Sequence, residues 1–370
     1  MVNKARLISK IIGFQFFRKI GFPKLLPINI TVAVTNKCTS RCKTCNLGKM
    51  YLKDPNIAKD DLKPREYEKI FKNIGKGNVF WFVFSGAEPF MRKDLVEIIK
   101  YAYNYCKPNV IVLPTNSLSS NIPERVEEIL KYCKDTIINV NLSLDGVGKD
   151  HDEIRGVNGN FEKVINLFNS LKKLKPKYQN FELNIHTVVS CYNFRKISDL
   201  HRYVVENLKP DAHITEIAEN KKEIENLNLN ITPDIKDYEK TIDILSEQIK
   251  KEKFSGFTKI KQVSRLVYYD LVKEIFKKKT QVIPCYAAIN EVQISPIGEV
   301  WNCSLMGSSM GNLRKENYDF KKVWKGKKAR DIRKKIKNKE CWCPVANIAY
   351  TNMICYPPTM FKIATGFLFR

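Results

Sequence analysis

The chain has 370 residues, of which 44% are hydrophobic and 28% are charged, and its formal net charge is +25. This length suits a catalytic core with one appended module, since domains commonly contain about 100–200 residues. The composition excludes a long disordered region. The positive charge would attract anionic partners, but the lysines are spread along the whole chain. We therefore expect no dedicated nucleic-acid binding, and the basic run 325–339 is expected to be a solvated helix face.

The cysteine content indicates a reducing environment. Eleven cysteines are too few for a disulfide scaffold in a chain of this length. The N-terminus lacks the apolar core and cleavage site of a secretory signal, and no apolar run reaches the ~18 residues that would cross a bilayer. We expect a cytoplasmic protein whose clustered cysteines are metal ligands or catalytic thiols rather than disulfides.

Both ends of the chain are apolar and basic. Residues 1–27 form an extension in which Ile, Leu and Phe are mixed with Lys and Arg, and residues 360–370 are again aromatic and basic. Two interpretations stay open. The ends rest on a membrane surface as amphipathic segments, which would make the protein peripheral at a membrane, or they pack against the rest of the protein.

Residues 28–220 alternate short β-branched runs with amphipathic helical segments, which is typical of β/α units around a parallel sheet. The expected strands cover residues 28–35, 79–85, 110–114, 136–144, 182–189 and 212–216. The expected helices between them cover residues 63–73, 94–104, 123–132, 161–174 and 197–207. Six such units favour an α/β fold, a partial, TIM-like (β/α)6 barrel, over a closed barrel of eight.

The rest of the chain divides into a connector and a small module. Residues 221–280 are polar and helical, with one helix reaching residue 251 and another over residues 260–277. Residues 281–370 contain five cysteines, several turns and little apolar core of their own. A bound metal would supply the stability that such a small unit lacks.

The strongest chemical signal is the run Cys38-Thr-Ser-Arg-Cys42-Lys-Thr-Cys45, in the loop directly after the first expected strand. Zinc sites usually use paired cysteines with a fourth ligand, and no fourth ligand is nearby. A cubane cluster held by three cysteines leaves one iron without a protein ligand, so that this iron can chelate a substrate or cofactor. The carboxyl end of a barrel strand is also where such folds place their chemistry.

This cysteine triad, with this spacing and location, resembles that of the radical S-adenosylmethionine (SAM) superfamily. The resemblance implies that Cys38, Cys42 and Cys45 hold a 4Fe-4S cluster whose open iron binds the amino and carboxylate groups of SAM. It also implies the activity: the reduced cluster cleaves SAM to methionine and a 5′-deoxyadenosyl radical, and this radical abstracts a substrate hydrogen.

Residues at the ends of the following strands extend the resemblance. The run Gly86-Ala87-Glu88-Pro89 is similar to the family's Gly-Gly-Glu-Pro turn, which holds the methionine amino group. By the same resemblance Ser143 and Arg155 would hold the methionine carboxylate, for which a forked guanidinium is suited, and Thr115 and Asn116 would lie nearer the nucleoside or substrate. Two departures stand out. Ala87 replaces the second Gly, and Thr44 stands where the family usually has an aromatic residue that packs on the adenine.

The C-terminal cysteines resemble the auxiliary-cluster modules called SPASM and Twitch. Twelve residues separate Cys285 from Gly298 and four separate Gly298 from Cys303; Trp324 and the run around Cys341 and Cys343 are also similar to that family. Five cysteines favour one auxiliary 4Fe-4S cluster. We expect Cys285, Cys303 and Cys355 to bind it, with Cys343 favoured over Cys341 as the fourth ligand. Zinc is the alternative, because thiolates suit both metals.

These features predict a radical SAM enzyme with an auxiliary cluster for electron handling or substrate anchoring. A glycan or lipid-linked small molecule and a peptide or protein are both open as substrates, with the former favoured by the apolar, basic ends. The electron donor would be a ferredoxin or flavodoxin. The alternative from another class is a non-catalytic iron-sulfur or zinc protein. A methyltransferase of the same superfamily is not favoured, because no added cobalamin-binding domain is visible.

Overall fold

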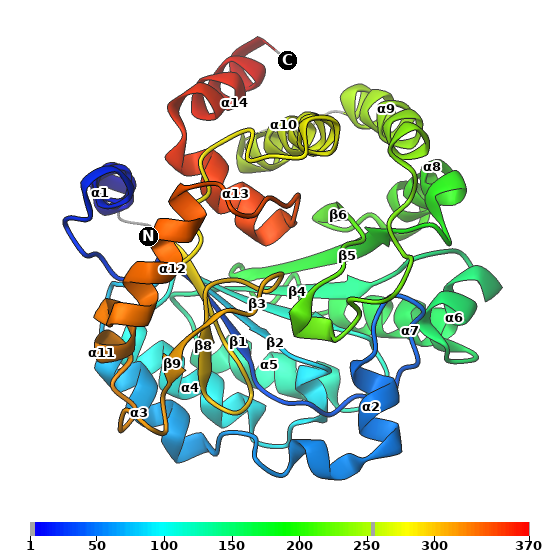
Figure 1. The fold of residues 1–370 in the computed structure, drawn as a ribbon. Helices are drawn as coiled ribbons and strands as arrows, with labels where there is room; N and C mark the ends of the chain where they lie inside the picture. Colours follow the sequence, from blue (N-terminus) through cyan, green and yellow to red (C-terminus); the bar gives the residue numbers. More distant parts are fainter. Residues whose placement is uncertain (1–3, 253–255, 370) are drawn as a thin grey trace.

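In the computed structural model, which describes residues 4–252 and 256–369, nine strands form one sheet in the order β6-β5-β4-β3-β2-β1-β7-β8-β9 (Figure 1). The strands from β6 to β7 in this order pair in parallel, and β8 and β9 pair antiparallel. The strands are β1 (Asn29–Ala33), β2 (Trp81–Ser85), β3 (Val110–Thr115), β4 (Ile137–Ser143), β5 (Phe181–Val189), β6 (Ala212–Ile217), β7 (Glu291–Ile294), β8 (Glu299–Trp301) and β9 (Ser309–Asn312).

The first six strands confirm the predicted partial (β/α)6 barrel, and each predicted boundary lies within two residues of the observed one. One feature was not predicted. β7 pairs in parallel with β1, with Asn29 opposite Glu291, so the C-terminal module continues the barrel sheet. The expected domain boundaries after residues 27, 220 and 280 stay predictions.

The helices frame this sheet (Figure 1). They are α1 (Lys4–Ile20), α2 (Leu47–Lys53), α3 (Pro64–Ile74), α4 (Leu95–Cys106), α5 (Ile122–Tyr132), α6 (Lys149–Arg155), α7 (Asn160–Lys172), α8 (Ile197–Tyr203), α9 (Ile235–Lys251), α10 (Gly256–Lys278), α11 (Phe320–Lys325), α12 (Lys327–Lys337), α13 (Ala346–Cys355) and α14 (Pro357–Phe369). The residues of α8 continue into a single π-helical turn, Val204–Leu208.

The two faces of the barrel sheet differ in polarity. In β4, Ile138, Val140 and Leu142 are fully buried in the main core, while the residues that alternate with them are partly exposed. Because successive side chains of a strand point to opposite faces, the apolar face packs on the helices. Asn139 and Asn141 then face the inside of the barrel, where Asn184 of the neighbouring strand donates hydrogen bonds to both of their side chains.

The predicted connector contains a second hydrophobic core. Tyr238 and Ile242 of α9 pack in it with Val272 of α10 and Met353 of α13. The helix α13 also reaches the inside of the barrel, where the Asn347 side chain contacts Asn29 and Thr31 of β1. The C-terminal segment is thus packed against the first barrel strand.

The Arg92 side chain stabilises the end of β1 by hydrogen bonds and an ion pair. Its guanidinium donates to the carbonyl oxygens of Val34 (2.6 Å) and Leu62 (2.5 Å) and forms an ion pair with Asp94 (2.6 Å). Val34 directly follows β1, so this buried side chain fixes the start of the loop that carries the first cysteines.

We expect Arg92→Met to lower the free energy of unfolding by roughly 3 kcal/mol, because two buried carbonyls and Asp94 lose their partner. Urea denaturation measures the change. Lys100→Met is the control: it breaks the exposed pair with Glu128 and should cost under about 1 kcal/mol. Equal effects of the two substitutions would contradict this role of Arg92.

Candidate active site

The triad loop, residues 36–46, carries Cys38, Cys42 and Cys45 between β1 and α2, at the carboxyl ends of the barrel strands. All three cysteines are free, and Cys38 and Cys42 are buried. Burial raises the pKa of Cys38 to about 11 and that of Cys45 to about 12, and the neighbouring Cys42 thiol contributes to both shifts. Three thiols therefore lie close together in one loop.

The surroundings of the three sulfurs suit a group with several negative thiolates. The backbone N–H of Ser40 donates to the Cys38 sulfur (3.4 Å), and the Asn116 side-chain amide lies 3.7 Å from the same atom. Arg155 Nη1 lies 3.8 Å from the Cys42 sulfur. Hydrogen bonds to cluster sulfurs are one way in which proteins tune iron-sulfur centres. Within residues 4–252 and 256–369, no three His, Cys, Asp or Glu side chains are arranged to hold a single metal ion.

The backbone of the triad loop is held by tight contacts with glycine. A Cβ atom on Gly48 would lie 1.8 Å from the Ser40 carbonyl oxygen, and one on Gly156 would lie 2.4 Å from the Arg41 carbonyl oxygen. The Arg41 N–H also donates to the carbonyl of Arg155 (3.1 Å). The loop thus passes so close to α2 and to the end of α6 that only glycine fits at these points.

The turn after β2 clamps the other side of the triad loop. Gly86 has φ +119°, and its Cβ would lie 2.6 Å from the Thr35 carbonyl oxygen. The N–H groups of Ala87 and Glu88 donate to the carbonyls of Thr35 (3.0 Å) and Lys37 (2.9 Å). The Ala that replaces the family's second Gly does not have positive φ here, so this departure requires no strained backbone.

Glu88 connects this turn to the end of β3. Its carboxylate accepts hydrogen bonds from the Asn116 N–H (2.7 Å), the Thr115 hydroxyl (2.9 Å) and the Phe90 N–H (3.1 Å). The side chain is 1% exposed, and burial raises its pKa to about 7. The structure therefore brings Glu88, Thr115 and Asn116 together, with Glu88 in a position that organises the strand ends.

Ser143 and Arg155 come from β4 and α6, and Arg155 lies beside the triad loop. Ser143 ends β4, where it pairs in register with His186 of β5. Arg155 ends α6 and forms a buried ion pair with Asp145 (2.8 Å). Burial alone would lower the pKa of Arg155, but Asp145 raises it, so the guanidinium stays charged beside the Cys42 sulfur.

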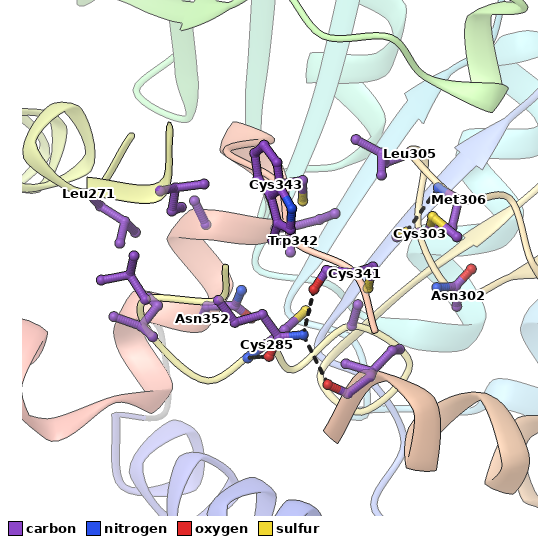
Figure 2. Close-up of a pocket in the computed structure, with 18 residues that line it drawn as sticks. Leu271, Cys285, Asn302, Cys303, Leu305, Met306, Cys341, Trp342, Cys343 and Asn352 are labelled. Atoms are coloured by element: carbon purple, nitrogen blue, oxygen red, sulfur yellow. Dashed lines mark hydrogen bonds between the residues drawn. The ribbon is translucent and has the colours of Figure 1, made fainter. Parts of the chain in front are cut away.

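Four of the five C-terminal cysteines line one pocket, which we call the four-cysteine pocket (Figure 2). They are Cys285, Cys303, Cys341 and Cys343. Burial raises the pKa of Cys285 and of Cys303 to about 12, and each of these thiols is close enough to Cys343 to raise the pKa of that thiol further.

The structure does not bring Cys355 to this pocket, although the sequence favoured it as a ligand. Cys355 is 0% exposed and lies among Phe14 and Tyr286, where its sulfur accepts a hydrogen bond from the Asn290 amide (3.3 Å). The physical reason is α13: ten helical residues at 1.5 Å each carry the chain about 15 Å before it reaches Cys355. The structure instead brings both Cys341 and Cys343 to the pocket.

A segment that the sequence did not single out joins the two cysteine groups. This bridging loop, residues 219–226, follows β6. The Asn46 N–H of the triad loop donates to the Ile224 carbonyl (3.1 Å), and the Asn226 side chain donates to the Thr44 carbonyl (2.8 Å). On the other side, the Glu223 N–H donates to the Ser304 carbonyl (3.1 Å), next to Cys303. Mostly backbone atoms make these contacts, which is why no side-chain motif revealed them.

A central cavity of about 440 Å³ lies beside the triad loop. Gly86 and Ala87 line one part of it, and Glu223, Gln293 and Trp301 line another. Ligand pockets commonly have volumes of about 300–1,000 Å³. The cavity therefore offers room for a ligand next to the turn that clamps the cysteine triad.

Comparison with known proteins identifies two domains in this chain. Residues 32–200 match the model of the Radical SAM superfamily, and residues 285–344 match that of the iron-sulfur cluster-binding domain SPASM. Among solved structures, Streptococcus suis SuiB aligns with a TM-score of 0.59 at 16% identity, over 89% of this chain and 72% of that one. The structure of anSMEcpe with bound AdoMet aligns with a TM-score of 0.55 at 19% identity, over 82% of both chains.

Curated relatives match about half of the chain or more. A probable GTP 3′,8-cyclase of Thermococcus kodakarensis is 27% identical over 48% of this chain and 53% of its own length. The PqqA peptide cyclase of Bradyrhizobium diazoefficiens is 22% identical over 52% of this chain and 46% of its own length. The Fe-coproporphyrin III synthase of Methanosarcina barkeri gives a longer match. It is 22% identical over 79% of this chain and 72% of its own length. The chain thus spans about half the length of the first two relatives.

We expect Gly86→Ala to remove iron from the triad loop, because the new Cβ would push the Thr35 carbonyl away and displace the loop. Gly159→Ala is the matched control: Gly159 also has positive φ, but nothing lies within 4 Å of the added atom, so it should cost only about 1–2 kcal/mol of backbone strain. The iron content per chain after anaerobic reconstitution and the thermal unfolding midpoint, measured for both variants, distinguish loss of iron from loss of stability. Equal iron in both variants would contradict the clamp.

The fold, the cysteine triad against the Gly86 turn, and the two matched domains agree with one another. They also identify the cofactors of the family, which are a 4Fe-4S cluster, SAM and auxiliary iron-sulfur clusters. The chain belongs to the radical SAM superfamily of enzymes, in the branch that carries a C-terminal SPASM domain.

Proposed function

We propose that the protein reductively cleaves SAM and uses the resulting 5′-deoxyadenosyl radical to abstract a hydrogen from a substrate in the central cavity. The observation that carries the proposal is the clamp between the triad loop and the Gly86–Ala87 turn, because it holds the loop with three free thiols against a turn that lines the cavity. The cluster and SAM supply the radical chemistry when bound. The chain supplies the ligands, the binding groups and the walls.

In this proposal each residue predicted for the cluster and SAM site has a place. Cys38, Cys42 and Cys45 hold the cluster. The backbone at Gly86 and Ala87 faces the cavity and binds the methionine amino group, while Glu88 positions the turn by holding the end of β3. Arg155 and Ser143 bind the methionine carboxylate, and Thr115 and Asn116 border the nucleoside. Asp145 keeps the Arg155 guanidinium oriented through their ion pair.

For the auxiliary cluster we propose the four-cysteine pocket, with Cys285, Cys303, Cys341 and Cys343 as ligands. Four thiols around one pocket complete the set that a 4Fe-4S cluster uses. Such a cluster would have no open iron and would exchange electrons with the substrate radical. The bridging loop supports this proposal, because it contacts both the triad loop and Ser304, the residue next to Cys303.

Two substrate classes remain in the proposal. A cavity of about 440 Å³ fits a small molecule, including a glycan or lipid-linked one, or a single peptide side chain. Relatives named as a PqqA peptide cyclase and a sporulation killing factor maturation protein favour peptide modification, whereas those named as heme synthases favour small molecules. An acidic ferredoxin or flavodoxin would be attracted to the chain's net charge of +25 as the electron donor.

Iron content and SAM cleavage test this proposal together. We expect about eight irons per wild-type chain, about four in the triple Ala variant of Cys38, Cys42 and Cys45, and 5′-deoxyadenosine from the wild type alone. Cys343→Ala should also fall to about four irons, whereas Cys355→Ala, the matched control, should keep all eight. A reduced, fully loaded wild type that makes no 5′-deoxyadenosine would overturn the function. Loss of iron in Cys355→Ala would overturn the ligand assignment.

We also propose that α1 rests on an anionic membrane surface. Its inner side is buried at Phe14 and Phe17, but one stripe of large apolar side chains at four-residue spacing is exposed: Ile8, Ile12, Phe16 and Ile20. Exposed Lys19 and Lys24 lie at the end of this stripe, the arrangement of an interfacial helix. In the described ranges no helix is long and apolar enough to cross a membrane.

Co-sedimentation with phosphatidylserine vesicles tests this contact. Wild-type protein should pellet with the vesicles and be released by high salt, because exposed charges are screened. Ile12→Asp combined with Phe16→Asp should abolish binding, whereas Ile244→Asp, at an equally exposed position of α9, should not. Equal pelleting of both variants would show that the stripe does not bind membranes.

A further inference from the structure

Acidic side chains gather where the bridging loop meets the barrel. Their carboxylates come from β6, the loop and β7: Glu216, Glu219, Glu223 and Glu291. Glu216, Glu219 and Glu223 each raise the pKa of the Lys221 ammonium between them, and Glu223 also raises the pKa of Glu291. This acidic cluster lies inside a protein whose overall charge is +25, so it is a local feature of the interior.

The cations available to this cluster are too few. Lys221 Nζ lies 3.8 Å from Glu216 Oε1, and although burial would lower the pKa of Lys221, Glu216 and the nearby carboxylates raise it. His186 Nε2 lies 3.7 Å from the same oxygen, but burial lowers the pKa of His186, so the ring is mainly neutral. Arg155 already forms an ion pair with Asp145. Among the residues that the structure describes, Lys221 is thus the one charged group that pairs with a carboxylate of this cluster.

The unpaired carboxylates show this shortage. Burial raises the pKa of Glu219 to about 7 and that of Glu291 to about 8, and it also raises the pKa of Glu223. Only Glu216, the partner of Lys221, has a lowered pKa. A carboxylate that is buried without a cation is held in its ionised form when a positive group arrives.

Gln293 gives an independent indication of a ligand. Its side chain on β7 is 2% exposed and lines the central cavity together with Glu223. The amide is close enough to the Glu223 carboxyl to counteract the rise in the pKa of that group, but among the described residues the amide oxygen has no hydrogen-bond partner. Buried polar atoms in native proteins nearly always have a partner. The Gln293 amide oxygen and the Glu223 carboxylate are both hydrogen-bond acceptors. A nitrogen that carries several N–H groups can donate to both of them.

Resting on the proposed function, which places the substrate in the central cavity, we propose that this substrate carries a cationic nitrogen, an ammonium or guanidinium group, bound between Glu223 and Gln293. Glu216, whose pKa is lowered, adds negative charge nearby. Such a group occurs on a free amine and on the Lys or Arg side chain of a peptide. The nitrogen anchors the substrate between the two cysteine groups, and the carbon to be activated then faces the Gly86 turn.

Binding of simple probes to the reconstituted holoprotein tests this. n-Butylguanidinium, n-butylammonium, n-butanol and n-butyrate have the same alkyl chain, and saturation-transfer NMR ranks their affinities. We expect the two cations to bind at least tenfold more tightly than butanol, and butyrate not at all. Putrescine and N-acetyl-Gly-Lys-Gly-amide then distinguish a free amine from a peptide side chain as the source.

Variants locate the site. Glu223→Gln should weaken cation binding about tenfold, and Gln293→Glu, which adds a carboxylate, should strengthen it. Glu316→Gln removes the same charge from a surface pair with Lys322 and should change nothing. Unselective binding by the wild type, tighter binding of Mg²⁺ than of the cations, or equal effects of Glu223→Gln and Glu316→Gln would overturn the proposal. Because 5′-deoxyadenosine formation is measured separately, these outcomes are distinct from a failure of the proposed function.

Discussion

β1 is hydrogen-bonded on both sides, to β2 and to β7, and the arrangement of the site depends on this double pairing. The pairing with β2 brings the Gly86 turn against the loop that leaves β1, because parallel strands end at the same edge of the sheet. The pairing with β7 brings the SPASM module to the other side of the same strand. One buried strand of five residues thus sets the positions of both cysteine groups.

The remaining constraints are local and act at the edge of that strand. Glycines at positions 48, 86 and 156 allow three backbones to approach the triad loop more closely than any side chain would permit. Arg92 and Glu88 then satisfy buried carbonyl and N–H groups that these approaches leave behind. The bridging loop completes the arrangement by hydrogen bonding to both cysteine-bearing segments, and its residues Glu223 and Glu225 line the central cavity.

Much of this was predictable from the sequence. The six barrel strands were found because β-branched runs alternate with helical periodicity, and the triad because its spacing and its place after the first strand are specific. The pairing of β7 with β1 was not found, since a four-residue strand carries no sign of its partner. The position of Cys355 away from the other four cysteines was not found, because spacing does not show which way α13 carries it. The bridging loop was missed because its contacts are made largely by carbonyl oxygens, which every residue has.

Anomalous diffraction at the iron edge, from crystals grown under anaerobic conditions, tests the central claim that the chain holds iron at two separate cysteine groups. The account predicts two iron clusters. One should contact Cys38, Cys42 and Cys45, and the other should fill the four-cysteine pocket, with Glu223 on the wall between them. Iron in only one of the two places, or iron bound to Cys355, would contradict the account.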